Sequence, residues 1–293
     1  MHVGIIGVGL MGHGIARNVL SRGGFALSFL DHPGNQPTDE IVGLGARPCA
    51  TSAEVAAASD VVILCVTGSP QVEAIITGAD GVASAIRPGA VVVDCSTALP
   101  ESTLRMGEII AKAGGAYIDA PMTRTAKHAH EGKLNLLVGG AAETLDKVRP
   151  VLASFTEKVD HVGPLGHGHR LKLLHNYVSV GFMTLLAEAA AQAADAGVDP
   201  QVFVDVLAGG GGASAALDRL APYIVSQDRE GLPFAVSNAQ KDIDYYRAMS
   251  DASGAQTVVA DGVSAALAKP VEAGLGEAYV PELVKLFRKG AGS

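Results

Sequence analysis

The chain of 293 residues is too long for a single hydrophobic core, so two domains are expected. Apolar residues make up 48% of it and charged residues 18%, a balance that excludes an intrinsically disordered protein. The net charge of −8 and the lack of a basic run argue against nucleic acid as a partner. The longest apolar runs are strand-sized, and no basic segment precedes the apolar N-terminus. We therefore expect no membrane span, no signal peptide and a cytoplasmic location.

A glycine-rich turn follows the first apolar run. Residues 3–6 are typical of a buried parallel strand, and apolar residues recur at helical spacing over residues 11–20. Between them, the spacing Gly7-x-Gly9-x-x-Gly12 permits a tight turn, a close approach of the backbone to phosphates and close packing of helix on strand. The positive end of the helix also attracts anions. The turn therefore predicts a dinucleotide-binding site that includes Gly7, Gly9, Leu10, Met11 and Gly12.

A second apolar run, over residues 25–30, ends at Asp31, nineteen residues after Gly12. An acidic residue at this place accepts hydrogen bonds from the ribose hydroxyls and repels the 2′-phosphate of NADP. No arginine directly follows Asp31, so we expect NAD to be preferred. NADP stays possible, because Arg47 or another distant base could reach the site. The alternative interpretation of Asp31 is a turn residue at a strand end.

Short apolar runs alternate with helical stretches up to about residue 162, which is typical of a doubly wound parallel sheet. We expect strands near residues 61–66, 91–94, 116–119, 135–138 and 158–162, with helices near 52–58, 71–76, 100–113 and 142–154. A long helix is expected from about His169 to Ala196. The prediction is an α/β Rossmann domain over residues 1–164, followed by an all-α domain over 165–293 that begins with this helix. Glycines 209–212 are expected to form a loop between two helices of that second domain.

The long helix carries a lysine and an amide near its start. Lys172 and Asn176 lie four residues apart, hence on one face, where they could share a substrate oxygen. At a domain boundary Lys172 would be partly removed from water, which lowers the pKa of a lysine toward the range useful in acid and base catalysis. The alternative is a solvated surface lysine.

Two further polar segments follow expected strands. Ser96 and Thr97 come directly after the strand at residues 91–94, at the carboxyl end where open α/β sheets bind ligands. Their hydroxyls could contact a substrate carboxylate and the nicotinamide, and either could cap the helix that begins at Pro100. Arg124 lies just beyond the strand at residues 116–119, and its guanidinium can donate two parallel hydrogen bonds to an anionic group. The alternative for Arg124 is a solvated loop residue.

Taken in chain order, these segments resemble the β-hydroxyacid dehydrogenase family. The resemblance covers nearly the whole chain and rests on five pieces: the glycine fingerprint, residues 94–100, residues 119–134, the pattern Gly166-x-Gly168-x-x-x-Lys172-x-x-x-Asn176, and Phe234 with Lys241-Asp242. It implies a Rossmann domain and an all-helical domain with the active site between them. It also implies a homodimer or homotetramer, and no metal.

The resemblance implies roles for single residues. Lys172 would be the general acid and base in hydride transfer between NAD(P) and a small anionic hydroxy acid, and Asn176 would hold the same substrate oxygen. The substrate would be bound by Ser96, Arg124, Thr125 and Lys241. The cofactor would also contact Val66, Thr67, Thr97 and Lys241.

The residues after Asp119-Ala-Pro121 depart from the family pattern. Family members commonly have Ser-Gly-Gly where this chain has Thr123-Arg124-Thr125. An Arg-Thr pair here is similar to the branch that contains sulfolactaldehyde reductase and γ-hydroxybutyrate dehydrogenase. We therefore expect Arg124 to hold the carboxylate or sulfonate of a short hydroxy acid or hydroxysulfonate.

Two other functions fit the same scaffold. Imine reductases resemble it but usually have another residue at the lysine position, and noncatalytic dinucleotide-binding scaffold proteins can lack the lysine. Lys172 argues against both.

Histidines and cysteines raise the question of a metal site. The pairs His128/His130 and His167/His169 have no Cys or acidic cluster beside them, so we interpret them as loop residues rather than ligands. The three cysteines Cys49, Cys65 and Cys95 lack metal or redox spacing and are expected to be free thiols.

Overall fold

The structure is a computed structural model, and it describes residues 1–289. The chain divides into two compact units: Met1–Lys172, and a second unit that begins at Leu173. The division falls within helix α9 (His167–Asp195). The domain boundary expected between residues 164 and 165 stays a prediction. Within residues 1–289, no helix is both long and apolar enough to cross a lipid bilayer.

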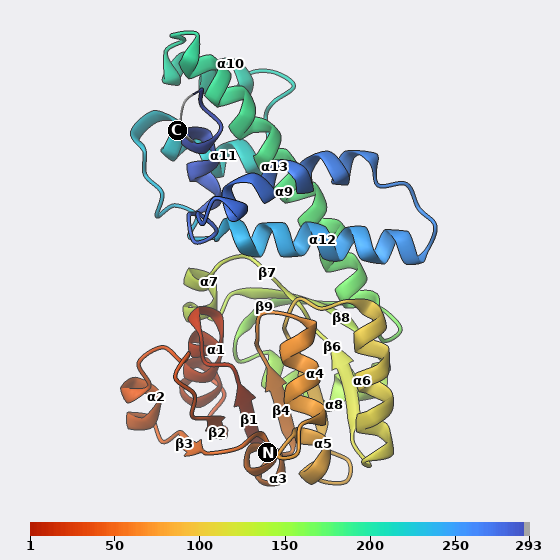
Figure 1. Ribbon diagram of the computed structural model, residues 1–293. Helices are drawn as coiled ribbons and strands as arrows, with labels where there is room; N and C mark the ends of the chain where they lie inside the picture. Colours follow the sequence, from red (N-terminus) through yellow and green to blue (C-terminus); the bar gives the residue numbers. More distant parts are fainter. Residues whose placement is uncertain (290–293) are drawn as a thin grey trace. The chain divides into compact units, whose positions relative to one another are not determined.

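The first unit is built on a nine-stranded sheet (Figure 1). Its strands are β1 (His2–Ile6), β2 (Ala26–Leu30), β3 (Arg47–Cys49), β4 (Val61–Leu64), β5 (Val91–Asp94), β6 (Ala116–Asp119), β7 (Met122–Thr123), β8 (Leu134–Gly139) and β9 (Thr156–Gly163). Strands β3-β2-β1-β4-β5-β6 are parallel neighbours in that order, the arrangement of a doubly wound dinucleotide-binding fold. The predicted Rossmann fold is confirmed. The sheet differs from an all-parallel one at β8, which runs antiparallel to β6 and β7.

Helices flank the sheet of the first unit. They are α1 (Leu10–Ser21), α2 (Asp39–Gly43), α3 (Ser52–Ala58), α4 (Ser69–Thr77), α5 (Val82–Ala85), α6 (Pro100–Lys112), α7 (Ala126–His130) and α8 (Ala142–Leu152). The helices expected in this unit are confirmed with small shifts at their ends. Elements α2, α5, α7, β3 and β7 were not predicted, because segments this short show too little periodicity to be recognised.

The core of the first unit lies on the two faces of the sheet. Val61 and Ile63 of β4 pack into one buried cluster, and the alternate residues Val62 and Leu64 pack into another. Successive side chains of a strand point to opposite faces, so a strand that is apolar throughout must be covered on both. This burial holds the carboxyl ends of the strands, where the candidate site residues begin, in fixed register.

The second unit is helical (Figure 1). It contains α9 from Leu173 onward, α10 (Pro200–Ala208), α11 (Ala215–Ser226), α12 (Val236–Ala252), α13 (Val258–Glu272), a short 3₁₀ turn η1 (Val280–Glu282) and α14 (Leu283–Leu286). Its core joins buried residues of α9, α11, α12 and α13, among them Met183, Leu220, Ile243 and Leu267. The expected helical second domain is confirmed, and residues 209–212 lie between α10 and α11 as predicted.

Candidate active site

The glycine-rich turn after β1 has two glycines that the protein itself requires. Gly7 has φ +98°, and a Cβ there would lie 2.2 Å from the carbonyl oxygen of Cys65. A Cβ on Gly12 would lie 1.9 Å from the carbonyl oxygen of Gly7. Both contacts are far shorter than packed atoms allow, so these two positions fix the close crossing of β1, β4 and α1.

Gly9 differs from its neighbours. A Cβ built there would meet no described atom within 4 Å, and the residue has an ordinary φ of −78°. Gly9 is the N-cap of α1, and no side chain among residues 1–289 caps this helix end. Leu10 is exposed and Met11 is half-buried beside it. An open glycine at an uncapped helix N-terminus fits a bound pyrophosphate, because it leaves room for phosphate oxygens and presents backbone donors to them.

Asp31 follows β2 at the rim of a cavity of about 350 Å³. The cavity is also lined by Thr51, Ser52 and Asp80, and its described lining residues include no Lys or Arg. Asp31 is exposed, and its backbone N–H donates to the carbonyl of Cys49 at 2.9 Å, which holds the strand end in place. The cavity therefore presents two carboxylates to whatever it binds.

The segment after β5 is held by hydrogen bonds in the first unit. The buried Ser96 donates its backbone N–H to Oδ1 of Asp94 at 2.9 Å, and its hydroxyl oxygen accepts from the backbone N–H of Val66 at 3.1 Å. Accepting from Val66 leaves the hydroxyl hydrogen of Ser96 as a donor for a ligand. Thr97 is half-buried and Thr67 is exposed. The structure thus brings Ser96 and Val66 together at the carboxyl ends of β4 and β5.

The start of α9 is fixed to the neighbouring strand by a carboxylate. Asp119, at the end of β6, accepts hydrogen bonds from the backbone N–H groups of Gly166 at 2.8 Å and His169 at 2.7 Å. Burial raises the pKa of the Asp119 carboxyl, while the adjacent His169 and the two backbone donors oppose that rise. Because Asp94 and Asp119 are register partners of β5 and β6, the first turn of α9 begins beside the Ser96 segment. Lys172, half-buried, lies one turn further along this helix.

Asn176 and Lys241 meet at one carboxylate of the second unit. The side-chain amide of Asn176 donates to Oδ2 of Asp242 at 2.6 Å, and Nζ of Lys241 lies 2.9 Å from Oδ1. Asn176 and Asp242 are both buried. Nζ of Lys241 also lies 5.2 Å from the centre of the Tyr245 ring. Asp242 therefore orients both side chains that sequence reasoning placed near the substrate.

The guanidinium of the exposed Arg124 is paired with two acceptors of the first unit. Its Nη1 donates to the carbonyl of Lys133 at 2.7 Å and forms an ion pair with Glu157 of β9. Its φ of +79° is in the left-handed region that favours glycine, the residue common in the family at this place. Thr125 is the N-cap of α7, and its hydroxyl lies 2.9 Å from Nδ1 of His128. The guanidinium is thus already partnered by a carboxylate of its own chain.

The interpretation of the His-x-His pairs as loop residues is wrong. His128 and His130 lie in α7, while His167 and His169 lie in the first turn of α9, where the ring of His169 is completely buried. Helical spacing continues two residues further toward the N-terminus than we predicted. Among residues 1–289, no three His, Cys, Asp or Glu side chains are arranged to hold a metal ion.

The three cysteines are free thiols, as expected. Burial, and then the nearby Asp94, raise the pKa of the Cys65 thiol to about 12. Burial also raises the pKa of the Cys95 thiol. Neither is the low-pKa thiol that nucleophilic or redox chemistry requires.

Sequence reasoning missed the residues that position others. They are Asp94, Thr103, Asp119, Glu157, His169 and Asp242. Several were noticed as parts of motifs, but their partners lie far away in the chain: 47 residues separate Asp119 from Gly166, and 66 separate Asn176 from Asp242. A charged residue at the end of a buried apolar strand, as at Asp94 and Asp119, is the signal that could have found these two, because a buried charge needs partners.

Known proteins resemble the chain over both units. Residues 2–163 match the profile of the NAD binding domain of 6-phosphogluconate dehydrogenase, and residues 166–287 match that of the NAD-binding region of NADP-dependent 3-hydroxyisobutyrate dehydrogenase. The chain is 33% identical to 2-(hydroxymethyl)glutarate dehydrogenase of Eubacterium barkeri, over 82% of this chain and 79% of that protein. It is 32% identical to L-threonate dehydrogenase of Cupriavidus necator, over 78% of this chain and 76% of that one.

The fold is similar to that of solved structures as well. A crystal structure of 3-hydroxyisobutyrate dehydrogenase from Salmonella typhimurium superposes with a TM-score of 0.86 at 26% identity, covering 98% of this chain and 100% of that chain. With the dinucleotide turn after β1 and both family profiles matched in order, the chain belongs to the β-hydroxyacid dehydrogenase family of NAD(P)-dependent oxidoreductases.

Proposed function

We propose that this chain transfers a hydride between NAD(P) and a short anionic β-hydroxy acid or hydroxysulfonate, with Lys172 as the general acid and base. One observation carries the proposal: Asp119 fixes the helix that bears Lys172 beside the Ser96 segment. A hydroxyl donor and a lysine then come from adjacent elements of the first unit. The names of the relatives, which are dehydrogenases of hydroxy acids, support the same chemistry.

When bound, NAD(P) accepts or returns the hydride. In the oxidative direction, neutral Lys172 takes the proton of the substrate hydroxyl as the C–H bond gives up its hydride and the C–O bond becomes a carbonyl. The products are the carbonyl compound, the reduced nicotinamide and a proton, which Lys172 releases to solvent. In reduction, protonated Lys172 returns that proton to the new alkoxide. Asn176 orients the same oxygen, and Ser96 donates its hydroxyl hydrogen to the substrate carboxylate.

Steady-state turnover tests the proposal. Formation of reduced nicotinamide should be measured with NAD and with NADP on a panel of hydroxyisobutyrate, serine, threonine, glycerate, γ-hydroxybutyrate, dihydroxypropanesulfonate and phenylserine. Turnover of one or more members supports a dehydrogenase. Binding of NAD without turnover of any member favours a noncatalytic scaffold or an imine substrate instead.

Arg124 is proposed to bind the carboxylate or sulfonate of the substrate, in competition with Glu157. Arg124→Ala should raise KM about tenfold to a hundredfold for the anionic substrates of the panel, because hydrogen bonds to charged groups contribute about 1.5–3 kcal/mol. Glu157→Gln frees the guanidinium and should lower the same KM by up to about fivefold, since exposed ion pairs contribute at most about 1 kcal/mol. An unchanged KM in Arg124→Ala for every accepted anionic substrate would rule out this role.

Asp31 is proposed to bind the ribose hydroxyls and to favour NAD. Asp31→Ser should weaken NAD about tenfold to a hundredfold, because a charge-assisted hydrogen bond is lost, and should improve NADP relative to NAD. Asp80→Asn, in the same cavity, is the matched control. It removes a second negative charge and should help NADP while leaving NAD binding intact. Both variants are titrated with both cofactors. If Asp31→Ser binds NAD as tightly as the wild-type chain, the ribose lies elsewhere.

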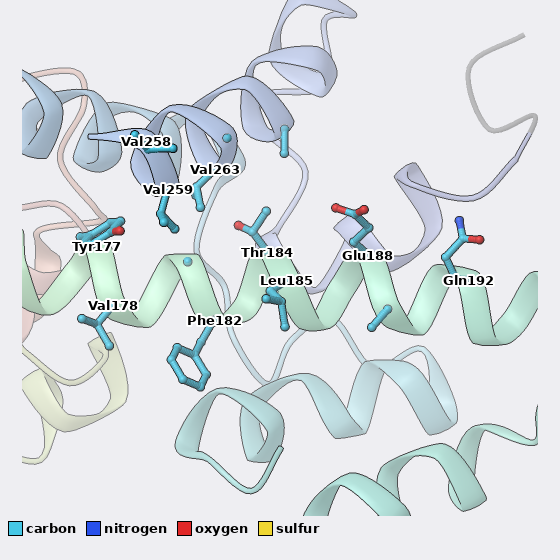
Figure 2. A pocket seen from close by; sticks show the side chains of 14 residues that line it. Tyr177, Val178, Phe182, Thr184, Leu185, Glu188, Gln192, Val258, Val259 and Val263 are labelled. Carbon is cyan, nitrogen blue, oxygen red and sulfur yellow. The ribbon is translucent and has the colours of Figure 1, made fainter. Parts of the chain in front are cut away.

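We also propose that the chain assembles with a second copy of itself through α9 and α13. A groove of about 810 Å³ lies between these helices, with Val258, Val259 and Val263 above α9 (Figure 2). Phe182, Leu185 and Val258 line this groove and are exposed, Leu185 by 67% and Val258 by 76% (Figure 2). Large exposed apolar faces mark interfaces, and a symmetric pair of helices would cover this one.

The mass of the protein in solution tests the assembly. The wild-type chain should elute as a dimer or tetramer, and Leu185→Glu combined with Val259→Glu should yield monomers, because a charge would be buried without a partner. Val206→Glu, on the exposed face of α10, is the control that should keep the wild-type mass. A monomeric wild-type chain would contradict the proposal.

A further inference from the structure

The ring of His169 joins two elements of the first unit that carry candidate site residues. It is completely buried in the first turn of α9. Its Nε2 lies 3.1 Å from the backbone carbonyl oxygen of Ser96, and its Nδ1 lies 2.7 Å from the hydroxyl oxygen of Thr103 in α6. Both ring nitrogens are therefore engaged, one with the segment after β5 and one with the helix that follows it.

The direction of the first bond follows from chemistry. A carbonyl oxygen only accepts, so Nε2 of His169 carries a hydrogen and donates it to Ser96. The Thr103 hydroxyl also lies 3.1 Å from the carbonyl of Leu99, so it either donates there and accepts from Nδ1, or donates to Nδ1. In both arrangements the ring links the Ser96 carbonyl to α9.

Buried carboxylates flank the ring on both sides. Asp94 Oδ2 lies 3.9 Å from Nε2, and Asp119 Oδ2 lies 3.8 Å from Nδ1. Asp94 also accepts from the hydroxyl of Tyr117 at 2.8 Å and from the backbone N–H of Ser96. A buried network of this kind fixes a unique arrangement, because each member loses its partner if another shifts.

We propose that His169 is a positioning residue that sets the place of Lys172 relative to Ser96. The His169 ring donates to the backbone carbonyl of Ser96, and the backbone N–H of His169 donates to Asp119. Lys172 lies three residues further along the same helix. This inference rests on the proposed function, in which Ser96 anchors the substrate and Lys172 exchanges its proton. Reaction geometry that drifts by about 1 Å can lower a rate about 10²-fold.

Three variants separate positioning from simple packing. His169→Leu removes both ring hydrogen bonds, and His169→Gln keeps one amide donor for Ser96. Thr103→Val is the matched control, because it removes only the partner of Nδ1 and leaves the link to Ser96. Each is assayed with the best substrate for kcat, KM and the deuterium isotope effect on kcat, and for NAD affinity by titration.

We expect His169→Leu to lower kcat about 10²-fold with little change in NAD affinity, and to raise the isotope effect because the chemical step becomes slower. His169→Gln should recover at least about tenfold of this loss, and Thr103→Val should stay near wild type. A folded His169→Leu protein with wild-type kcat and isotope effect would overturn the inference. If His169→Leu fails to fold, a loss of kcat in Thr103→Val at least as large as that in His169→Gln would overturn it equally.

Amide hydrogen exchange gives a readout that does not depend on turnover. In His169→Leu, the protection of residues 96–99 and of the first turn of α9 should fall together, whereas His169→Gln should retain part of it and Thr103→Val should preserve both. Unchanged protection in His169→Leu would overturn the inference even if the enzyme is active. A wild-type chain that turns over no substrate would overturn the proposed function, and the exchange result would still decide whether His169 ties the two segments.

Discussion

Replacing Lys172 with alanine should lower kcat by ~10²- to 10⁴-fold, the usual contribution of a general acid or base. The affinity for NAD should stay nearly unchanged, because the dinucleotide turn after β1 lies on other elements of the first unit. The substrate then binds with its hydroxyl in place, but no side chain takes the proton as the hydride leaves. Steady-state kinetics and cofactor titration on the same preparation measure both quantities.

A second lysine gives the matched control. Lys147→Ala, on the exposed side of α8, removes the same charge from the first unit and should leave kcat at the wild-type value. Small primary amines added to Lys172→Ala should restore part of the rate, because they supply the missing base. Wild-type turnover in Lys172→Ala would remove this lysine from the mechanism.

Replacing Gly9 with alanine should leave the fold intact and weaken NAD binding about tenfold to a hundredfold, the cost of forcing a methyl group into a filled contact. Without a cofactor, the folded chain has room for the added methyl group, since a Cβ at Gly9 would meet no described atom within 4 Å. We expect the methyl group to clash with the pyrophosphate when NAD binds. Thermal unfolding and NAD titration together distinguish loss of binding from loss of structure.

Two other glycines set the limits of this experiment. Gly12→Ala should destabilise the protein strongly, because its Cβ would lie 1.9 Å from the carbonyl oxygen of Gly7. Gly43→Ala in α2, where a Cβ also meets no described atom within 4 Å, should change neither stability nor NAD affinity by much. If Gly9→Ala binds NAD as tightly as the wild-type chain, the pyrophosphate does not lie on this turn.

The fold could be predicted where the sequence pattern is long and regular. Strand β4 and the first three residues of β5 are apolar because both faces of the sheet are covered, and α9 is long enough for its periodicity to be evident. Strand β3 could not be predicted, since it has only three residues, one of them Pro48, and exists as a strand only through pairing with β2. The antiparallel direction of β8 relative to β6 and β7 depends on pairing between separate segments, which local sequence patterns do not encode.

The candidate site divides in the same way. The residues that we propose to touch a ligand, such as Gly9 and Lys172, belong to motifs with fixed spacing that the sequence shows. The residues that hold them, such as Asp119 and Asp242, act through partners dozens of residues away. The long helix was expected to begin at about His169, whereas it begins two residues earlier, at His167. The burial of His169 follows from tertiary packing against Asp94, Asp119 and Thr103, and helical spacing alone does not show it.

The most direct test of the account is transfer of isotope from substrate to cofactor in a single turnover. The wild-type chain is mixed with NAD and with its best substrate from the panel, deuterated at the carbinol carbon, and the reduced nicotinamide is examined by mass spectrometry. We predict one deuterium on the nicotinamide and an equal amount of the carbonyl product, both lost in Lys172→Ala. Reduced nicotinamide without deuterium, or NAD bound to a chain that reduces none of it with any member of the panel, would contradict the assignment as a hydroxy acid dehydrogenase.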